Sequence, residues 1–240
     1  MKNKLIILLG ILLFVILLLV AMFIPLKNSK KEYKEKMLGI DYEIEKNEAS
    51  IDKYSTENPV VAMYIEKYGS VVIELYPDVA PNTVNNFISL VKSGFYDNNT
   101  IHRLVPGFVL QGGDPDGMGS GGPGYTIKGE FSSNGFENNL KHEKGVVSMA
   151  RGNDKDSAGS QFFIMLDKSD YLDGEYAAFG KVIDGFDNIE KIEDNERVAD
   201  SDTGKLVNNL TIKKAIIDLK GKEYPNVEKN GSLSNSVGEQ

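Results

Sequence analysis

Cysteine and tryptophan are absent from the 240 residues, and histidine occurs only twice. Without cysteine the chain cannot form disulfides, bind zinc through thiolates or use a cysteine nucleophile. The two histidines, His102 and His142, lie far apart in the sequence, and no carboxylates cluster around them. A histidine metal site or a Ser-His-Asp triad therefore has little material to form from. We predict a protein with no metal and no cofactor.

An excess of positive charge is also missing, because the formal net charge is −8 and the isoelectric point is near 5.0. Nucleic acids are bound through clustered lysine and arginine side chains, so we predict that nucleic acid is not a partner. Hydrophobic residues make up 41% and charged residues 26% of the chain, which is typical of a globular protein. The length fits one domain of ordinary size with extensions.

Charge is absent from residues 5–26, which are almost entirely leucine, isoleucine, valine and phenylalanine. At a rise of about 1.5 Å per residue, a helix of this length crosses a hydrocarbon core about 30 Å thick. The alternative is a cleaved secretory signal, whose apolar part is shorter and ends in small residues. Here Ala21 follows Leu19 and Val20, which makes a poor cleavage site. We therefore predict an uncleaved transmembrane anchor over residues 1–26.

The orientation of this anchor is indicated by two conflicting signals. The lysines between residues 27 and 36 outnumber Lys2 and Lys4, which by the positive-inside rule would keep the C-terminal part inside. Against this, a basic N-terminus, an apolar stretch and a long polar chain together are typical of an exported protein. We predict a single-pass protein of the cell membrane, with an extracytoplasmic domain carried on a charged stalk of residues 27–58.

Short β-branched and aromatic runs separated by turn residues dominate the chain after the stalk. Residues 60–65 and 70–75 are separated by Gly69 and predict a hairpin, and similar runs recur up to residue 219. The predicted fold class is mainly β: a closed eight-stranded antiparallel barrel over residues 59–221, capped by two α-helices and without a free sheet edge. Residues 222–240 are polar and predict a disordered tail.

The first helix is predicted to begin at Pro81 and to end before Gly94. Its apolar residues recur at helical spacing and form one stripe, made of Val84, Phe87, Ile88 and Val91. Asn85 and Asn86 lie off this stripe, so we predict that they face solvent. A second, shorter helix is predicted over residues 186–192.

Two glycine-containing loops match ligand-binding motifs only in part. Residues 119–124 have the glycine spacing of a dinucleotide fingerprint, but a proline and a strand-like run follow where a helix is required. Residues 200–204 place two aspartates as a calcium loop does, but their glycine comes one position early. We predict no nucleotide site in the first loop and a plain surface loop in the second.

An arginine lies among mostly apolar residues in the stretch 101–114. Placing the Arg103 guanidinium in such a strand is costly unless its donors find acceptors, which suggests that it has a function. We expect Arg103 to project from the outer wall of the barrel and to be partly solvated. His102 should face the other side of the strand, because successive side chains alternate.

Four blocks of this sequence resemble the cyclophilin family of peptidyl-prolyl cis-trans isomerases. They follow the family's order across roughly residues 59–221. They are residues 102–114 (HRLVPGFVLQGGD), 148–150 (SMA), 159–164 (GSQFFI), and 172–174 (LDG) with 179–182 (FGKV). The resemblance implies an eight-stranded antiparallel barrel capped by two helices, which agrees with the fold predicted from the residue pattern.

The activity that the resemblance implies is rotation about the peptide bond before proline. The barrier of about 18–20 kcal/mol comes from lost amide resonance, so neither a nucleophile nor a covalent intermediate is needed. A donor aimed at the proline nitrogen stabilises the twisted amide more than the planar one. Arg103 matches the family's donor, Gln111 would hold it in register, and Phe108 would line the proline pocket beside them.

The resemblance also implies a set of substrate-binding residues. Some would complete the apolar pocket for the proline ring, while the backbone of Ala150 and Arg151 would pair with the extended residues before proline, flanked by Gln161. The whole set consists of Val109, Ala150, Arg151, Gln161, Phe163, Tyr171, Leu172 and Tyr176.

Three positions depart from many eukaryotic cyclophilins. Tyr171 stands where they carry tryptophan, Tyr176 where they carry histidine, and Val109 where they carry methionine. The pocket keeps a similar character, but the family's tight grip on cyclosporin uses the tryptophan indole. The resemblance therefore implies weak sensitivity to that drug.

We hypothesise a monomeric, membrane-tethered isomerase that acts on proline-containing unfolded or exported polypeptides near the membrane. An alternative is a proline-segment binding module or holdase chaperone with little turnover. A lipocalin-like barrel carrying a small ligand would need an empty interior, against which the bulky inward-facing candidates argue.

Overall fold

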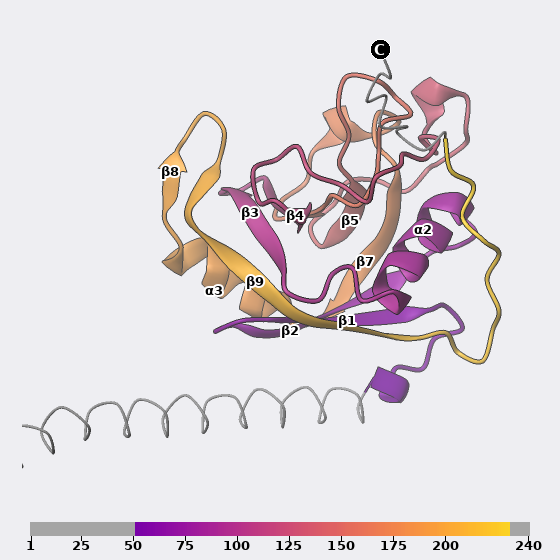
Figure 1. Cartoon of the computed structure of the whole chain (residues 1–240), viewed down its shortest axis with the longest axis horizontal. Helices are drawn as coiled ribbons and strands as arrows, with labels where there is room; N and C mark the ends of the chain where they lie inside the picture. The colour runs from indigo at the N-terminus through magenta and orange to yellow at the C-terminus, as the bar shows by residue number, and fades with distance from the viewer. Residues whose placement is uncertain (1–50, 231–240) are drawn as a thin grey trace, which may run out of the picture. The chain divides into compact units, whose positions relative to one another are not determined.

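A computed structural model of the chain describes residues 51–230, which form a closed antiparallel β-barrel (Figure 1). Its strands are hydrogen bonded in the order β1-β2-β7-β5-β6-β4-β3-β9, and β1 also pairs with β9, which closes the cylinder. The predicted closed eight-stranded barrel is thereby confirmed. The strands of the cylinder are β1 (Val60–Ile65), β2 (Gly69–Leu75), β3 (Asn99–Val105), β4 (Val109–Asp114), β5 (Val146–Met149), β6 (Phe162–Met165), β7 (Ala178–Asp184) and β9 (Lys205–Asp218).

A further short strand, β8 (Val198–Asp200), lies outside the cylinder and forms a hairpin with the start of β9. This hairpin exists because β9 is 14 residues long and pairs in turn with β8, β3 and β1. Figure 1 shows the hairpin projecting beside β3. Its turn, residues 201–204, therefore lies close to the strand that carries Arg103.

Two α-helices, α2 (Pro81–Lys92) and α3 (Phe186–Asn195), lie on opposite sides of the barrel (Figure 1). The stripe predicted for α2 is buried, and the Phe87 ring lies 5.0 Å from that of Phe179 and 5.1 Å from that of Tyr96. The first turn of α2 is capped from a distant loop, because the Glu130 carboxylate accepts the backbone N–H groups of Asn82 (3.0 Å) and Thr83 (2.7 Å). Three short 3₁₀ helices complete the fold: η1 (Ile51–Lys53), η2 (Ser132–Asn134) and η3 (Asp170–Leu172).

The prediction that Asn85 and Asn86 face solvent is wrong, because both are buried. The Asn86 amide donates to the Gly159 carbonyl at 2.7 Å, and its oxygen accepts the Tyr125 hydroxyl at 2.7 Å. A loop therefore covers the face of α2 that points away from the barrel core. The buried amide is tolerated because its donor and its acceptor are both satisfied.

A β-bulge at His102 sets the orientation of β3. Arg103 is opposite Gln111 on β4, but Ile101 is opposite Gly112, so β3 has one extra residue between the two pairs. The bulge lets Ile101 and Leu104, which simple alternation would place on opposite faces, both enter the core. Arg103 is left half-buried on the outer wall.

The His102 side chain is buried, and neither ring nitrogen has a hydrogen-bond partner among the described residues. Burial lowers its pKa below the usual value; the neighbouring Arg103 charge adds to this effect, and Asp114 opposes it. The ring is therefore neutral in the folded protein near neutral pH.

The two ends of the described chain pack on the barrel. Ile51 is buried against β1 and β2, and the Tyr54 hydroxyl donates to Asp184, so residues 51–58 of the predicted stalk lie on the domain. Residues 222–230, where we expected disorder, follow the surface to Thr126. Among residues 51–230 no helix is long and apolar enough to cross a membrane, and the predicted anchor lies outside this range.

Acidification should destabilise the domain through His102. In the unfolded chain the His102 ring takes up a proton below a pKa of about 6.5, whereas the buried ring resists protonation. The free energy of unfolding therefore has its full value above that pH and declines below it. We expect urea unfolding midpoints to fall between about pH 7.5 and pH 5, a window above the titration of ordinary carboxylates. His102→Phe should reduce this fall; His142, whose pKa is also lowered, accounts for a remainder. A variant as pH-sensitive as the wild type would contradict the assignment.

Candidate active site

The Arg103 guanidinium is held on two sides by hydrogen bonds. Nη1 donates to the Gln111 side-chain oxygen at 3.1 Å, and Nε donates to the backbone carbonyl of Thr203 at 2.7 Å. No hydrogen bond joins Nη2 to any of the described residues, so the donors of this nitrogen are unpaired among them. Burial lowers the pKa of the guanidinium, but an arginine remains charged in proteins.

Two glutamines extend the hydrogen bonds of Arg103 along the barrel wall. Since Gln111 accepts from Arg103 through its oxygen, its amide nitrogen is free to donate to the Gln161 oxygen at 3.0 Å. Gln161 in turn donates to the carbonyls of Gly119 at 3.1 Å and Gly121 at 2.9 Å. Each side-chain amide can take only one orientation in this series of hydrogen bonds, and this fixes the plane of the Arg103 guanidinium.

A cavity of about 170 Å³ opens beside Arg103, and it is called the apolar cavity here because most of its lining residues are apolar or aromatic. Most of the residues predicted to bind substrate meet here, and the lining comes from β3, β4, the turn between them, β6, η3 and the loops after β5 and η3. The lining consists of Arg103, Phe108, Val109, Gln111, Ala150, Arg151, Phe163, Leu172 and Tyr176. Two predicted residues are absent from it: Gln161 lines the neighbouring cavity, and Tyr171 is 69% exposed with its ring stacked on Phe108 at 5.9 Å.

The back of the apolar cavity is supported by a buried polar network that composition alone did not predict. The His142 ring stacks on Phe163 at 6.0 Å and is hydrogen bonded to Asp173 and to the Ser148 hydroxyl, each at 3.1 Å. We expected little material for a Ser-His-Asp arrangement, yet these three residues are in hydrogen-bonding contact. Ser148 is 0% and His142 1% exposed, so no substrate reaches them.

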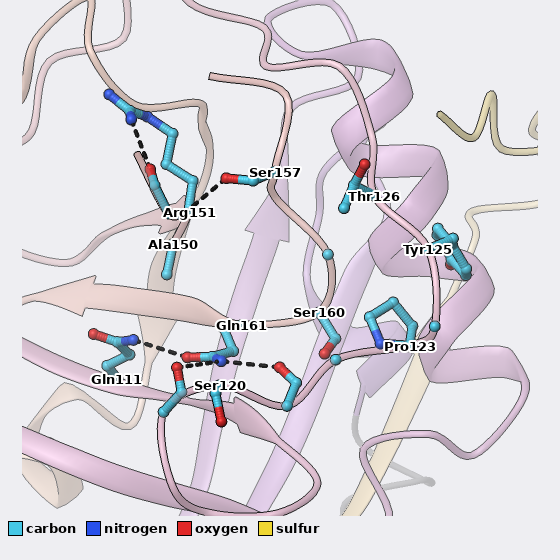
Figure 2. Close-up of a pocket in the computed structure, with 16 residues that line it drawn as sticks. Gln111, Ser120, Pro123, Tyr125, Thr126, Ala150, Arg151, Ser157, Ser160 and Gln161 are labelled. Atoms are coloured by element: carbon cyan, nitrogen blue, oxygen red, sulfur yellow. Dashed lines mark hydrogen bonds between the residues drawn. The ribbon is translucent and has the colours of Figure 1, made fainter. Parts of the chain in front are cut away.

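A second, larger cavity of about 520 Å³ adjoins the first and shares Gln111, Ala150 and Arg151 with it (Figure 2). Residues 119–126 form one wall, and residues 157 and 159–161 form another. Its lining is rich in glycine and serine and contains no leucine, isoleucine, valine or phenylalanine, unlike that of the apolar cavity. The two cavities therefore form neighbouring compartments that meet at Gln111, Ala150 and Arg151.

Asp114 organises the glycine-rich wall of the second cavity. Its buried carboxylate accepts the backbone N–H groups of Asp116 at 2.8 Å and Met118 at 3.1 Å, as well as that of Gly119. Burial raises its pKa, but the backbone N–H groups of Asp116, Gly121 and Gly119 outweigh burial and hold the pKa below the usual value. A side chain at Gly121 would place its Cβ 2.0 Å from the carboxylate, which explains this glycine. The loop thus wraps around a carboxylate of its own chain.

Arg151 separates the two cavities and is itself fixed. Its Nε donates to the Glu175 carbonyl at 3.1 Å, and its guanidinium lies 4.7 Å from the Tyr176 ring centre. The Ala150 N–H donates to the Gln161 carbonyl at 2.9 Å. The expected pairing of this backbone with a substrate would therefore have to use other groups than the Ala150 N–H.

The turn of the β8–β9 hairpin is a part of the site that the sequence did not reveal. Residues 200–204 were predicted to be a plain surface loop, but the Thr203 carbonyl is an acceptor for Arg103. Asp200 shapes the turn, because its carboxylate accepts the Asp202 N–H at 2.9 Å and the Thr203 hydroxyl at 3.0 Å. The described residues contain no cluster of three or more His, Cys, Asp or Glu side chains that could hold a metal.

Comparison with known proteins agrees with this geometry. The family model described as "Cyclophilin type peptidyl-prolyl cis-trans isomerase/CLD" matches residues 60–217. The chain belongs to the cyclophilin family. It is 46% identical over 132 residues to peptidyl-prolyl cis-trans isomerase B of Bacillus subtilis, covering 55% of this chain and 89% of the relative. It is also 38% identical over 157 residues to a peptidyl-prolyl cis-trans isomerase of Helicobacter pylori, and this match covers 65% of this chain and 89% of the relative.

A solved structure supports the same assignment. The chain resembles a Cryptosporidium parvum cyclophilin-type isomerase, crystallised in the presence of the dipeptide Ala-Pro, with a TM-score of 0.59 and 35% identity. The likeness covers 66% of this chain and 98% of that protein. The protein is thus a cyclophilin-type peptidyl-prolyl cis-trans isomerase. The family match ends at residue 217, so the C-terminal segment that pairs with Thr126 lies beyond it.

Displacing the hairpin turn should slow this isomerase. Gly204 has a φ of +74°, and an added Cβ would lie 2.5 Å from Val105 and 2.8 Å from the Leu104 carbonyl. We expect Gly204→Ala to move Thr203 away from Arg103 and to lower kcat/KM about tenfold, the effect of a lost hydrogen bond to a charged group. The NMR signal of the Arg103 Nε–H should shift.

The matched control for this variant is Gly135→Ala. Gly135 has almost the same φ, +75°, but an added Cβ there meets nothing within 4 Å. The control carries the same backbone strain without touching Arg103. Equal losses of activity in the two variants, or an unmoved Arg103 signal, would show that the turn does not position the guanidinium.

Proposed function

We propose that Arg103 catalyses rotation about X-Pro bonds by donating a hydrogen bond from Nη2 to the proline nitrogen as the amide twists. The observation that carries the proposal is a guanidinium fixed through Nε and Nη1 at the edge of an apolar cavity, with Nη2 unpaired among the described residues. The nitrogen lone pair becomes available only when resonance is lost. The donor therefore acts on the transition state more than on the ground state.

The other predicted residues have supporting roles in this proposal. Phe108, Val109, Phe163, Leu172 and Tyr176 would hold the proline ring, because they give the smaller cavity its apolar wall. Gln111 would keep Arg103 in its plane, and the exposed Tyr171 would cover Phe108.

The substrate in this proposal is an extended proline-containing segment. A chain that leaves the apolar cavity past Ala150 meets the second cavity next, so we assign the latter to a side chain upstream of proline. Gln161 would flank this path. The relative crystallised with Ala-Pro supports proline-containing peptides as the substrate class.

Arg103→Ala tests the mechanism directly. We expect kcat/KM for a proline peptide to fall about a hundredfold or more, as when a transition-state donor is removed, while the peptide dissociation constant changes little. Arg103→Lys keeps the charge but not the planar fork, so it should recover only part of the rate. NMR exchange spectroscopy measures both quantities without a coupling protease.

Two results would overturn this mechanism. An Arg103→Ala variant with near wild-type turnover would remove Arg103 from catalysis. A wild-type protein that binds proline peptides without accelerating their isomerisation would instead favour the proline-segment binding module or holdase.

The cellular context that we propose is the outer face of the cell membrane, with residues 1–26 as anchor and with unfolded or exported polypeptides as clients. The apolar, uncharged run of residues 5–26 supports the anchor. We further propose a monomeric isomerase domain. The large apolar side chains that the described residues expose are dispersed over different elements: Met118, Tyr171, Ile183 and Val207.

Fractionation of cells tests the location. We expect the full chain in the membrane fraction, and we expect protease added to intact cells to degrade the domain because it lies outside. A cytoplasmic membrane protein in the same cells serves as the control for lysis. Complete protection of the domain would place it inside, and recovery in the soluble fraction would exclude the anchor.

A further inference from the structure

The segment of residues 222–230, here called the C-terminal strap, follows β9 and lies beyond the family match, which ends at residue 217. In Figure 1 it is the yellow chain that runs from the end of β9 past α2. Tyr224 and Val227 are half-buried against the hydrophobic core. The strap is therefore packed on the domain along its length.

Asn82 ties the strap to α2 through two reciprocal hydrogen bonds. Its side-chain nitrogen donates to the Glu228 carbonyl at 2.9 Å, and its side-chain oxygen accepts the Glu228 N–H at 2.8 Å. An asparagine amide paired in this way imitates a neighbouring β-strand. Because the Asn82 N–H is bonded to Glu130, the helix end that holds the strap is itself fixed.

The strap then reaches the wall of the second cavity. The Asn230 N–H donates to the Thr126 carbonyl at 2.8 Å, and its side chain donates to the Asp156 carbonyl at 3.2 Å. The Lys229 ammonium lies 4.0 Å from the centre of the Tyr125 ring. Tyr125 and Thr126 both line the cavity, as does Ser157, the neighbour of Asp156.

The wall segment at Thr126 is thereby held between two chains. Ile127 forms a β-bridge with Ala158 on one side, and Thr126 forms one with Asn230 on the other. Without the strap, this segment would be an unpaired edge next to a glycine-rich loop, and the Thr126 carbonyl would lose its partner. In Figure 2 Tyr125 and Thr126 lie across the cavity from Gln111 and Gln161.

We propose that the C-terminal strap is a specificity element of this isomerase. By fixing the Tyr125–Thr126 wall, it sets the width of the second cavity and hence the preference for the upstream substrate side chain that enters there. The inference rests on the proposed role of that cavity. Among the described residues, no hydrogen bond, ion pair or ring contact joins the strap to the lining of the apolar cavity, so its effect falls on selectivity rather than on the rotation step itself.

The test uses the full chain and short proline peptides that differ only at the second residue before proline, which is glycine, alanine or leucine. Turnover of each peptide is measured by NMR exchange spectroscopy. Asn82→Ala removes both bonds to Glu228, and Asn230→Pro removes the N–H that pairs with Thr126. The control is Lys222→Ala, which removes a hydrogen bond to the Glu57 carbonyl and an ion pair with the Glu57 carboxylate at the start of the strap.

We expect the wild type to discriminate between the leucine and glycine peptides, and both strap variants to reduce that ratio by about threefold or more, within the range that pocket contacts give. Turnover of the glycine peptide should stay within about twofold of the wild type, because the contacts that hold Arg103 are untouched. Lys222→Ala should keep the wild-type ratio. Should Asn82→Ala or Asn230→Pro fail to fold, Lys229→Ala, which removes only an exposed cation from the Tyr125 ring, should shift the ratio in the same direction.

The possible results of this experiment distinguish an error about the strap from an error about the second cavity and from an error about the proposed function. Folded strap variants with the wild-type ratio, or with an equal loss for all peptides, overturn the specificity role of the strap. A wild type that turns over every peptide equally overturns the role of the second cavity, and the strap proposal with it. A wild type without any turnover overturns the proposed function itself.

Discussion

A permanent charge on the wall of an apolar barrel is the constraint around which this structure is organised. Arg103 belongs to a strand whose neighbouring side chains fill the core, and its guanidinium is stable there only if it faces outward and finds acceptors. The bulge at His102 provides the outward direction. Gln111 and the Thr203 carbonyl provide acceptors on two sides, so the charge is held in one orientation before any substrate arrives.

Closure of the barrel holds the strands that carry Arg103 and its partners in fixed positions. The residues around the apolar cavity come from strands that are paired in one continuous cylinder and from the segments that connect these strands. Because β1 pairs with both β2 and β9, none of the cylinder strands is a free edge that could fray. The loops that border the cavities are each held by hydrogen bonds: the glycine-rich loop by Asp114 and Gln161, and the hairpin turn by Asp200.

The resemblance to cyclophilins implied most of the residues around the apolar cavity, whereas side-chain patterns in the sequence were sufficient for the barrel and the stripe of α2. They were insufficient where the decisive group is a backbone atom or a distant partner. Thr203 contributes a carbonyl, which any residue possesses, so the residues around it carried no signal of their own. Asn86 appeared polar and therefore exposed, because its partners Gly159 and Tyr125 are remote in sequence. The polar composition after residue 221 indicated disorder, yet reciprocal pairing with Asn82 orders residues 222–230.

The buried contact between Ser148, His142 and Asp173 has a consequence for any polypeptide that rests in the groove. The same three residue types can cleave peptide bonds when a serine oxygen is exposed to substrate. Here the Phe163 ring lies between the histidine and the cavity, and the serine is sealed within the barrel wall. A polypeptide in the groove can therefore lie one aromatic ring away from a buried Ser-His-Asp arrangement that has no access to its backbone.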